Sequence, residues 1–233
     1  MSQSDNQFSI WQQEHVAGDF LPSETADTPL DPSGGVVDFF AFLKERGVVS
    51  GSVLDIGCGK GRNSLYAASI GFSVTAMDFV AEAVEGCAAQ AIARGVSKNI
   101  HAVQHRMDET WSFSDNSFDL IVDSFATIDV DSAVGRMIAI TEMHRTLKPG
   151  GYALVQVVSV DDEYEAQQIA ARPASELNSC FWPNGKFQKD YTEEELREVY
   201  AHFEIVCLEK RAKPAVKMNQ TYTATNYWMI LRK

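Results

Sequence analysis

Apolar and polar positions follow two periods along most of the chain, and the change from one to the other predicts strands separated by helices. Short apolar runs of strand length stand between longer segments whose apolar positions recur about every 3.6 residues. The expected strands are residues 52–56, 72–78, 100–104, 118–124 and 152–160. The expected helices are residues 34–46, 62–70, 81–94, 131–147 and 161–171. Such alternation is typical of a parallel sheet covered by helices.

The pattern changes after residue 172. Residues 173–189 show neither period and are expected to be irregular. Thr192 and the three glutamates after it predict a helix start, because a hydroxyl cap and an acidic first turn satisfy free amides and the helix dipole. Residues 203–208 and 222–231 then indicate two strands without a long helix between them. We therefore expect an α/β fold with a doubly wound, mostly parallel seven-stranded sheet that ends in an antiparallel C-terminal pair.

The length of 233 residues predicts a single domain over residues 1–233. Residues 1–33 are polar and carry three prolines, so neither a strand nor a long helix is expected to run across those prolines. The same segment carries enough apolar side chains to fold back onto the domain. It is expected to be an N-terminal arm, either a packing arm or a lid over a pocket.

Charge and cysteine content exclude several classes of binding partner and site. The net charge of −12 and the pI of about 4.8 oppose binding to phosphate backbones, so no nucleic acid is expected. The four cysteines are far apart and show no CxxC pair, so no metal site or disulfide framework is expected. The chain has no apolar run of membrane-spanning length and no apolar signal core at its N-terminus. These features together predict a cytoplasmic protein.

The most informative stretch is VLDIGCGKGRNSLYAA, residues 53–68, which joins a strand, a glycine turn and a helix. The glycines are spaced GxGxG, whereas a dinucleotide fingerprint is GxGxxG. Asp55 stands two residues before the first glycine, where a carboxylate repels a pyrophosphate and suits an ammonium group. S-adenosylmethionine is such a ligand, since it has no phosphate and carries an ammonium, a carboxylate and a sulfonium.

Over Val53 to Val158 the chain resembles the class I S-adenosylmethionine-dependent methyltransferases of the small-molecule type. DIGCGKG resembles the first motif of the family, FSDNSFDLIVDSF the stretch leading into the fourth strand, and LKPGGYALVQV the fifth-strand motif. The resemblance implies that Asp78 binds the ribose hydroxyls and that Met107 and Asp108 meet the adenine. Within the family, GRNSLYAASIGFSVTAMD resembles the branch of tellurite-resistance methyltransferases, and the menaquinone-biosynthesis type is another near pattern.

The predicted ligand is therefore S-adenosylmethionine, with S-adenosylhomocysteine as its product. Asn63 is a candidate for holding the methionyl carboxylate, and Phe79 and Met107 are candidates for enclosing the purine. Cys58 is expected to be a small side chain near the ligand. The full set of residues predicted to bind the cofactor is Asp55, Gly57, Cys58, Gly59, Gly61, Asn63, Asp78, Phe79, Met107, Asp108, Asp123 and Ser124.

The methyl acceptor is expected to be a small molecule. Some relatives that methylate amino groups carry Asn/Asp-Pro-Pro-aromatic after the fourth strand, and this chain has Asp123-Ser124-Phe125-Ala126 instead. That departure disfavours a nucleic-acid base or a protein amide. The determinants of the acceptor are expected in residues 1–33, 125–131 and the variable insertion at 161–191. Aromatic residues that could line its pocket or simply pack are Trp11, Phe181, Trp182 and Tyr191.

The expected reaction is methyl transfer by in-line displacement, for which alignment is essential and a strong base is optional. Candidate bases are His15, His105 and Asp123. Two alternatives stay open: a non-catalytic regulatory module that binds S-adenosylmethionine, and a nicotinamide-dependent oxidoreductase. The sequence decides neither the acceptor atom nor the oligomeric state.

Overall fold

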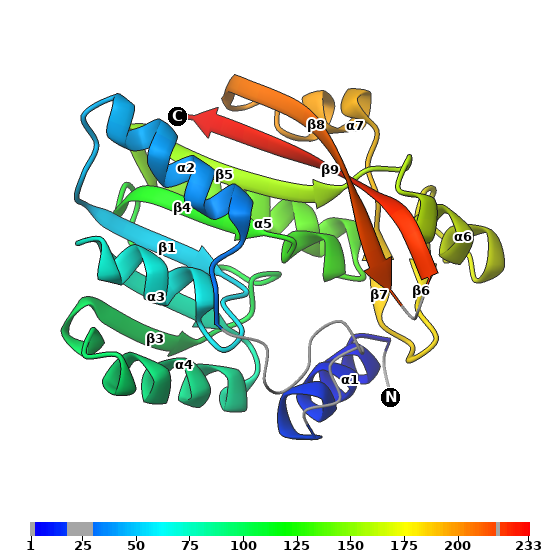
Figure 1. Cartoon of the computed structure of the whole chain (residues 1–233), viewed down its shortest axis with the longest axis horizontal. Coiled ribbons are helices and arrows are strands. Elements are labelled where there is room, and N and C mark those ends of the chain that lie inside the picture. Colours follow the sequence, from blue (N-terminus) through cyan, green and yellow to red (C-terminus); the bar gives the residue numbers. More distant parts are fainter. Residues whose placement is uncertain (1–2, 18–29, 218–219) are drawn as a thin grey trace.

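The computed structural model describes residues 3–17, 30–217 and 220–233. At its centre lies a seven-stranded sheet in the order β3-β2-β1-β4-β5-β9-β8 (Figure 1). The parallel strands are β1 Ser52–Ile56, β2 Ser73–Asp78, β3 Ile100–Gln104, β4 Phe118–Ser124 and β5 Leu147–Val158. Two antiparallel strands, β9 Gln220–Arg232 and β8 Glu204–Lys217, complete the edge next to β5. The predicted fold class is confirmed.

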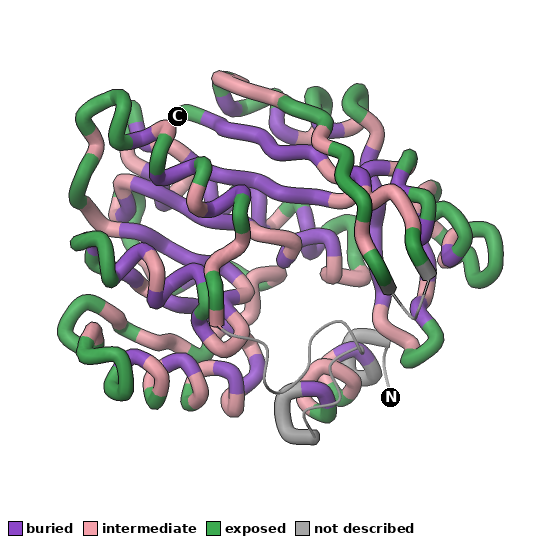
Figure 2. Tube along the Cα trace, viewed as in Figure 1, coloured by how far each residue is buried: buried purple, intermediate pink, exposed green. Residues whose placement is uncertain are grey.

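Helices cover both faces of this sheet (Figure 1). The first face carries α2 Gly34–Glu45, α3 Arg62–Ser69 and α4 Ala81–Ala93, and the second carries α5 Ala133–Thr146 and α7 Glu193–Val199. Neighbouring residues of β1 point to opposite faces: Val53 packs in the core that contains Phe39 of α2, and Leu54 in the core that contains Ile140 of α5. The central strands are buried along most of their length (Figure 2) because both faces are covered.

The predicted start of α7 is confirmed. The Thr192 hydroxyl accepts a hydrogen bond from the Glu195 amide at 3.1 Å, and the Glu195 carboxylate accepts one from the Thr192 amide at 2.8 Å. This reciprocal pair is a capping box, which satisfies two backbone donors that the helix itself leaves free.

Three parts of the fold differ from the expectation. The chain opens with a helix, α1 Gln3–Ala17, which ends before the prolines. Residues 173–189 are not wholly irregular, because β6 Ser179–Phe181 and β7 Phe187–Lys189 form an antiparallel hairpin there. The β8–β9 pair is longer than predicted. The remaining elements are α6 Glu163–Ala171 and two single turns of 3-10 helix, η1 Ser97–Asn99 and η2 Thr127–Asp129.

The first helix contacts two distant parts of the chain. On one side the Gln7 side-chain amide donates to the Gly185 carbonyl at 2.8 Å and accepts from the Phe187 amide at 3.0 Å, in the β6–β7 hairpin. On the other side the Phe8 ring lies 5.6 Å from the Phe79 ring, centroid to centroid, at the end of β2. Helix α1 therefore bridges the hairpin and the region after β2 (Figure 1).

Among the described residues, no helix combines the length and the apolar character that crossing a bilayer requires.

Candidate functional site

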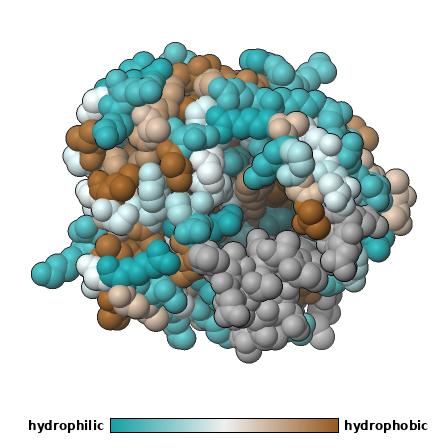
Figure 3. All heavy atoms as spheres, in the orientation of Figure 1, coloured by the Kyte–Doolittle hydropathy of each residue, from teal (hydrophilic) through white to brown (hydrophobic). Residues whose placement is uncertain are grey.

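A large cavity, of about 1180 Å³, opens at the carboxyl ends of the parallel strands. Its wall includes the turns after β1, β2 and β4, the start of α2, helix α1 and the β6–β7 hairpin. The chain order reverses between β1 and β4, and this is where open α/β sheets bind ligands. Part of the cavity is visible as a hollow in the face of the molecule shown in Figure 3.

The glycine turn after β1 forms one wall of this cavity. Gly57, Gly59 and Gly61 have φ angles of 63°, 54° and 89°, a backbone region that side chains disfavour. A Cβ at Gly57 would lie 2.5 Å from the Ala126 Cβ, and one at Gly61 would lie 2.5 Å from the Cys87 sulfur. Glycine is therefore required both for the turn and for its close packing on α4 and on the loop after β4.

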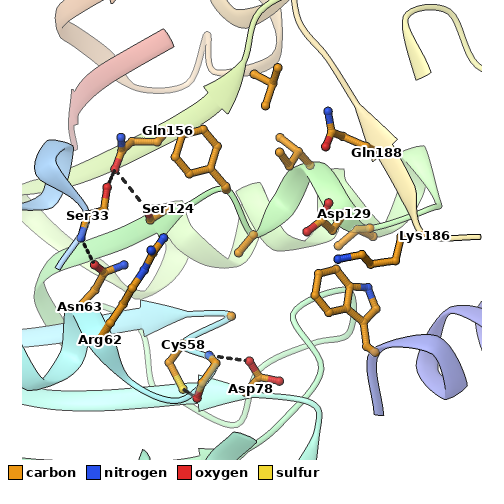
Figure 4. Close-up of a pocket in the computed structure, with 18 of the residues that line it drawn as sticks. Ser33, Cys58, Arg62, Asn63, Asp78, Ser124, Asp129, Gln156, Lys186 and Gln188 are labelled. Carbon is orange, nitrogen blue, oxygen red and sulfur yellow. Dashed lines mark hydrogen bonds between the residues drawn. The ribbon is translucent and has the colours of Figure 1, made fainter. Parts of the chain in front are cut away.

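Asp78 ends β2 and lies against this turn. Its carboxylate accepts one hydrogen bond from the Gly59 amide at 2.9 Å (Figure 4) and one from the Val80 amide at 3.0 Å. The side chain lines the cavity although only 6% of the residue is exposed. The carboxylate thus fixes the glycine turn and faces the position where the resemblance to the methyltransferases places the ribose.

Cys58 also faces the cavity from the turn. Contact with the Cys87 thiol and burial both raise the pKa of Cys58, and the nearby carboxylates of Asp55 and Asp78 act in the same direction. A thiol with a raised pKa is a poor nucleophile at neutral pH. The position of Cys58 fits the expected small side chain near the ligand.

Asp55 lies beneath the turn and is not part of the cavity wall. It is 2% exposed, and its carboxylate accepts a hydrogen bond of 2.5 Å from the Ser64 hydroxyl of α3. Burial raises the pKa of Asp55 to about 7, although the Ser64 hydrogen bond and the charge of Arg62 oppose the increase. The structure therefore assigns Asp55 to the link between β1 and α3, behind the cavity wall.

Asn63 and Arg62, at the start of α3, do line the cavity (Figure 4). The Asn63 side-chain oxygen accepts a hydrogen bond from the Ser33 amide at 2.9 Å, so its amide nitrogen is the group left to meet a ligand. An amide donor and a guanidinium at the beginning of a helix suit a carboxylate, because the helix dipole adds positive potential there.

Gln156 of β5 connects two walls of the cavity, a role that sequence reasoning did not find. Its side-chain oxygen accepts hydrogen bonds from the Ser33 hydroxyl at 3.1 Å and from the Ser124 hydroxyl at 3.2 Å (Figure 4). Gly35 makes room for this side chain, since a Cβ there would lie 2.3 Å from the Gln156 nitrogen. The predicted residue Ser124 therefore lies at the cavity wall, held by β5.

The side of the cavity after β2 and β3 carries the residues expected near the purine. Phe79, Met107 and Asp108 all line the cavity. The Asp108 carboxylate is held by Arg106 through two hydrogen bonds, of 3.0 and 2.6 Å. Two half-buried apolar side chains beside an oriented carboxylate fit the flat, polar-edged shape of an adenine.

The three candidate bases are not brought together in the cavity. Asp123 is 0% exposed, and its carboxylate accepts hydrogen bonds from the Ala126 amide and from the amide and hydroxyl of Thr127. It supports the turn after β4 from behind and does not line the cavity. His105 binds the Arg106 carbonyl through Nδ1 at 2.8 Å and also lies outside the cavity wall. The side chain of His15 lies outside the described residues.

The far end of the cavity is formed by α1, η2, α6 and the β6–β7 hairpin, and we call it the acceptor end. Of the four aromatic residues named from the sequence, Trp11 and Trp182 line it, whereas Phe181 and Tyr191 do not. Lys186 donates a hydrogen bond of 2.9 Å to the Glu14 carboxylate, and its ammonium lies 4.2 Å from the centroid of the Trp11 ring. Helix α1 is thereby fixed across this end of the cavity.

Asp129 and Lys186 are the main charged groups that sequence reasoning missed. Figure 4 shows Lys186 directed toward Asp129, on the side of the cavity away from the Cys58–Asp78 turn. Both residues lie within ranges expected to determine the acceptor, 125–131 and 161–191, but no local pattern distinguished them. Their proximity depends on how the hairpin folds over η2, which only the structure reveals.

The strand order, the antiparallel C-terminal pair and the glycine turn at the switch point together define a class I methyltransferase fold. Residues 53–151 match a family model described as a methyltransferase domain. This part of the chain is similar to the class I S-adenosylmethionine-dependent methyltransferases, whose methyl donor is the predicted cofactor. This similarity favours the methyltransferase interpretation over a nicotinamide-dependent oxidoreductase.

Several known proteins are similar to parts of the chain. It is 35% identical over 113 residues to a malonyl-[acyl-carrier protein] O-methyltransferase of Erwinia billingiae, covering 48% of this chain and 41% of that protein. It is 32% identical over 119 residues to the ubiquinone/menaquinone biosynthesis C-methyltransferase UbiE of Geotalea daltonii, covering 50% of this chain and 49% of that protein. The chain thus spans less than half the length of either of these curated relatives.

Solved structures share the fold over a larger part of the chain. A SAM-dependent methyltransferase from Methanosarcina mazei is 26% identical, with a TM-score of 0.67, over 79% of this chain and 93% of that one. The 1,6-didemethyltoxoflavin-N1-methyltransferase of Burkholderia thailandensis is 20% identical, with a TM-score of 0.64, over 99% and 86%. The latter was solved with 1,6-didemethyltoxoflavin and S-adenosylhomocysteine bound. TehB from Haemophilus influenzae also shares the fold. It is 20% identical, with a TM-score of 0.65, over 95% of this chain and 67% of that one.

Proposed function

We propose that this protein transfers a methyl group from S-adenosylmethionine to a small-molecule acceptor by in-line displacement. The observation that carries the proposal is one continuous cavity that extends from the glycine turn to the acceptor end. Its volume of about 1180 Å³ exceeds the roughly 300–1,000 Å³ of most single-ligand pockets. The cavity therefore has room for a donor and an acceptor side by side.

The residues around the turn fit the donor part by part. The Asp78 carboxylate suits the ribose diol, Asn63 and Arg62 suit the aminoacyl carboxylate, and Phe79 and Met107 suit the two faces of the purine. The turn itself allows close approach because its glycines carry no side chains. When bound, the donor supplies a methyl group already activated by a sulfonium.

The protein's contribution to the reaction is orientation and exclusion of water. Binding both partners in one cavity converts a bimolecular reaction into a unimolecular one, which can lower the barrier by about 7–11 kcal/mol. Helix α1 and the β6–β7 hairpin cover the acceptor end, and this supports the hypothesis that residues 1–33 act as a lid. The segment 161–191 supplies the hairpin and so serves as the acceptor-side insertion.

The test combines donor binding with an acceptor screen. Calorimetry of S-adenosylhomocysteine binding should show an affinity at least about 10-fold lower for Asp78→Ala than for the parent protein, because a charged acceptor of hydrogen bonds is lost. Asp78→Asn is the matched control, since it keeps one oxygen to accept from the Gly59 amide. Equal binding by Asp78→Ala and the parent would show that the ribose assignment is wrong.

The screen measures release of S-adenosylhomocysteine from S-adenosylmethionine in the presence of varied small molecules. The proposal expects turnover with at least one class of acceptor. Tight donor binding without turnover against any class would instead support a non-catalytic regulatory module. The cavity volume beyond the donor site favours the enzyme, because a sensor needs no second chamber.

A further inference from the structure

The elements around Asp129 contribute more carboxyl groups than cations to the acceptor end of the cavity. Among the described residues, the cavity-lining side chains from α1, η2, α6 and the β6–β7 hairpin include three carboxyl groups, Glu14, Asp129 and Glu165, and one ammonium, Lys186. Strand β8 adds two cations to the cavity wall, Lys213 and Arg211, and the Arg211 guanidinium is paired with the Asp38 carboxylate. The ammonium of Lys186 is already bound to Glu14. An anionic acceptor, such as a carboxylate, would therefore meet net repulsion, whereas a cation or a group that becomes cationic would be attracted.

Asp129 is the carboxyl group best placed to meet an acceptor. It ends η2, directly beyond the turn after β4, and lies half-buried in the cavity wall. Within the described part of the chain its carboxylate accepts no hydrogen bond, in contrast to Asp123, whose carboxylate is bound by three donors. A half-buried carboxyl group in a cavity wall that is left without a protein donor is available to a ligand.

The aromatic residues of this end favour the same chemistry. The indole rings of Trp11 and Trp182 both line it, and the Lys186 ammonium lies 4.2 and 5.7 Å from their centroids. Indole faces attract positive charge through their quadrupole. The rings thus already bind one cation at this end and would also stabilise positive charge that develops on an acceptor.

We propose that the acceptor end is a subsite for a nitrogen base, meaning an amine or a nitrogen heterocycle with an N–H, and that Asp129 binds this N–H and takes its proton. The inference rests on the proposed methyl transfer and specifies its acceptor. A neutral nitrogen gains positive charge as it attacks, which the carboxyl groups and indole faces stabilise. A phenolate or carboxylate acceptor would enter as an anion, against the charge of the subsite.

The step balances without a further reagent. The nitrogen lone pair forms the new bond to the methyl carbon while the carbon–sulfur bond breaks and its electron pair remains on sulfur. The nitrogen then carries a positive charge, and its proton passes to the Asp129 carboxylate. The products are the N-methylated acceptor, neutral sulfur in S-adenosylhomocysteine and a protonated Asp129.

The surroundings of Asp129 suit proton transfer near neutral pH. Desolvation and the nearby carboxylates of Glu14, Glu165 and Asp123 together raise the pKa of Asp129 to about 8, against the opposing charge of Lys186. A base is most effective when its pKa lies near the working pH. Because the ionised carboxylate is the active form, the rate should increase with pH and level off above about 8.

The first experiment compares acceptor classes and variants. Release of S-adenosylhomocysteine is measured with panels of amines, N–H heterocycles, phenols and carboxylic acids. We expect turnover with the amines and the N–H heterocycles. In Asp129→Asn the kcat should be reduced by about 100-fold or more, and it should no longer increase with pH. Glu194→Gln, which removes an exposed carboxylate of α7 remote from the cavity, is the matched control and should behave as the parent.

The second experiment measures binding and does not depend on turnover. Tryptamine and indole-3-propionate share a ring and carry opposite charges, and each is titrated into the protein saturated with S-adenosylhomocysteine. We expect tryptamine to bind at least about 10-fold more tightly. Asp129→Asn should narrow this difference while leaving the affinity for S-adenosylhomocysteine within about two-fold of the parent value.

The outcomes separate the two proposals. Turnover of phenols or carboxylic acids that is insensitive to Asp129→Asn would overturn the nitrogen subsite and leave methyl transfer standing. Nitrogen acceptors that react equally well with Asp129→Asn would overturn the role of Asp129. Equal binding of the two indole probes would also contradict the subsite, even if no acceptor in the panels were turned over.

Discussion

Single residues of the glycine turn are constrained by two separate effects, the sign of φ and the space available. Gly61 has a φ of 89° and a neighbouring sulfur, that of Cys87, 2.5 Å from a potential Cβ. Gly47 has a similar φ of 81° and no atom within 4 Å of that position. The comparison of these two glycines separates backbone strain from crowding.

Gly61→Ala should destabilise the protein by about 2–6 kcal/mol, because strain of roughly 1–3 kcal/mol adds to overpacking of similar size. Gly47→Ala should cost only the strain, about 1–3 kcal/mol. Urea unfolding of the two variants measures both values. Cys87→Ala removes the atom nearest to the new methyl group. Gly61→Ala should therefore destabilise the Cys87→Ala variant less than it destabilises the parent protein. Equal costs for both single variants would contradict the crowding argument.

At the scale of whole elements, helix α1 depends on tertiary contacts with the β6–β7 hairpin. Gln7 is 6% exposed, and it makes both of the side-chain hydrogen bonds to Gly185 and Phe187 described above. Gln7→Ala removes the side-chain partner of the buried Phe187 amide and of the half-buried Gly185 carbonyl, which should cost about 1–3 kcal/mol of docking free energy.

Hydrogen exchange measures this docking directly. Amides of α1 should exchange at least about 10-fold faster in Gln7→Ala than in the parent, because each 1.4 kcal/mol changes the open population ten-fold. Gln13→Ala, an exposed substitution on the same helix, is the control and should leave exchange unchanged. Unaltered exchange in Gln7→Ala would show that the hairpin does not hold the helix in place.

Elements with strong local patterns were predictable from the sequence, and those formed by long-range contacts were not. Strands β1, β3 and β4 begin and end at the predicted residues, since continuous apolar runs mark them. The strands of the β6–β7 hairpin have three residues each, too few to show a period. Helix α1 has a largely polar sequence and is fixed by partners more than 160 positions away, such as Lys186 for Glu14.

The same distinction applies to the site. The donor side could be predicted because Gly57, Gly59, Gly61 and Asp78 lie in one strand–turn–helix–strand segment with a distinctive spacing. The carboxyl groups and the ammonium of the acceptor end come from α1, η2, α6 and the hairpin, which no sequence spacing relates. Asp55 and Asp123 were predicted from their places at strand ends, where the structure shows them buried behind the cavity wall.

At the scale of the whole molecule, several buried carboxyl groups link stability to pH. Burial raises the pKa of Asp55 to about 7, of Asp123 to about 6 and of Asp190 to about 8. Asp129 adds a further raised value of about 8. A carboxyl group with a raised pKa binds its proton more strongly in the folded state, so its contribution to stability is complete below pH 4 and is lost as the pH rises through the folded value.

The free energy of unfolding of the ligand-free protein should therefore fall as the pH rises from 5 to 8. Groups with a lowered pKa, such as Glu142 beside Arg145, lose their stabilising effect only in more acidic solution. Urea unfolding across this range tests the prediction. Asp190→Asn should make the free energy of unfolding depend less on pH, because it removes one of the carboxyl groups with a raised pKa. Asp190 is 1% exposed and lies outside the cavity, so the substitution leaves the cavity wall unchanged. A stability that increases from pH 5 to pH 8 would contradict this account.

The position of the two halves of the cavity along the chain has an evolutionary consequence. The family match covers residues 53–151, which supply most of the donor side, whereas Trp11, Glu14, Trp182 and Lys186 of the acceptor end lie outside it. If the acceptor end holds the methyl acceptor, as proposed, substitutions in α1 and the β6–β7 hairpin change which acceptor binds while the glycine turn, and with it the donor site, stays the same.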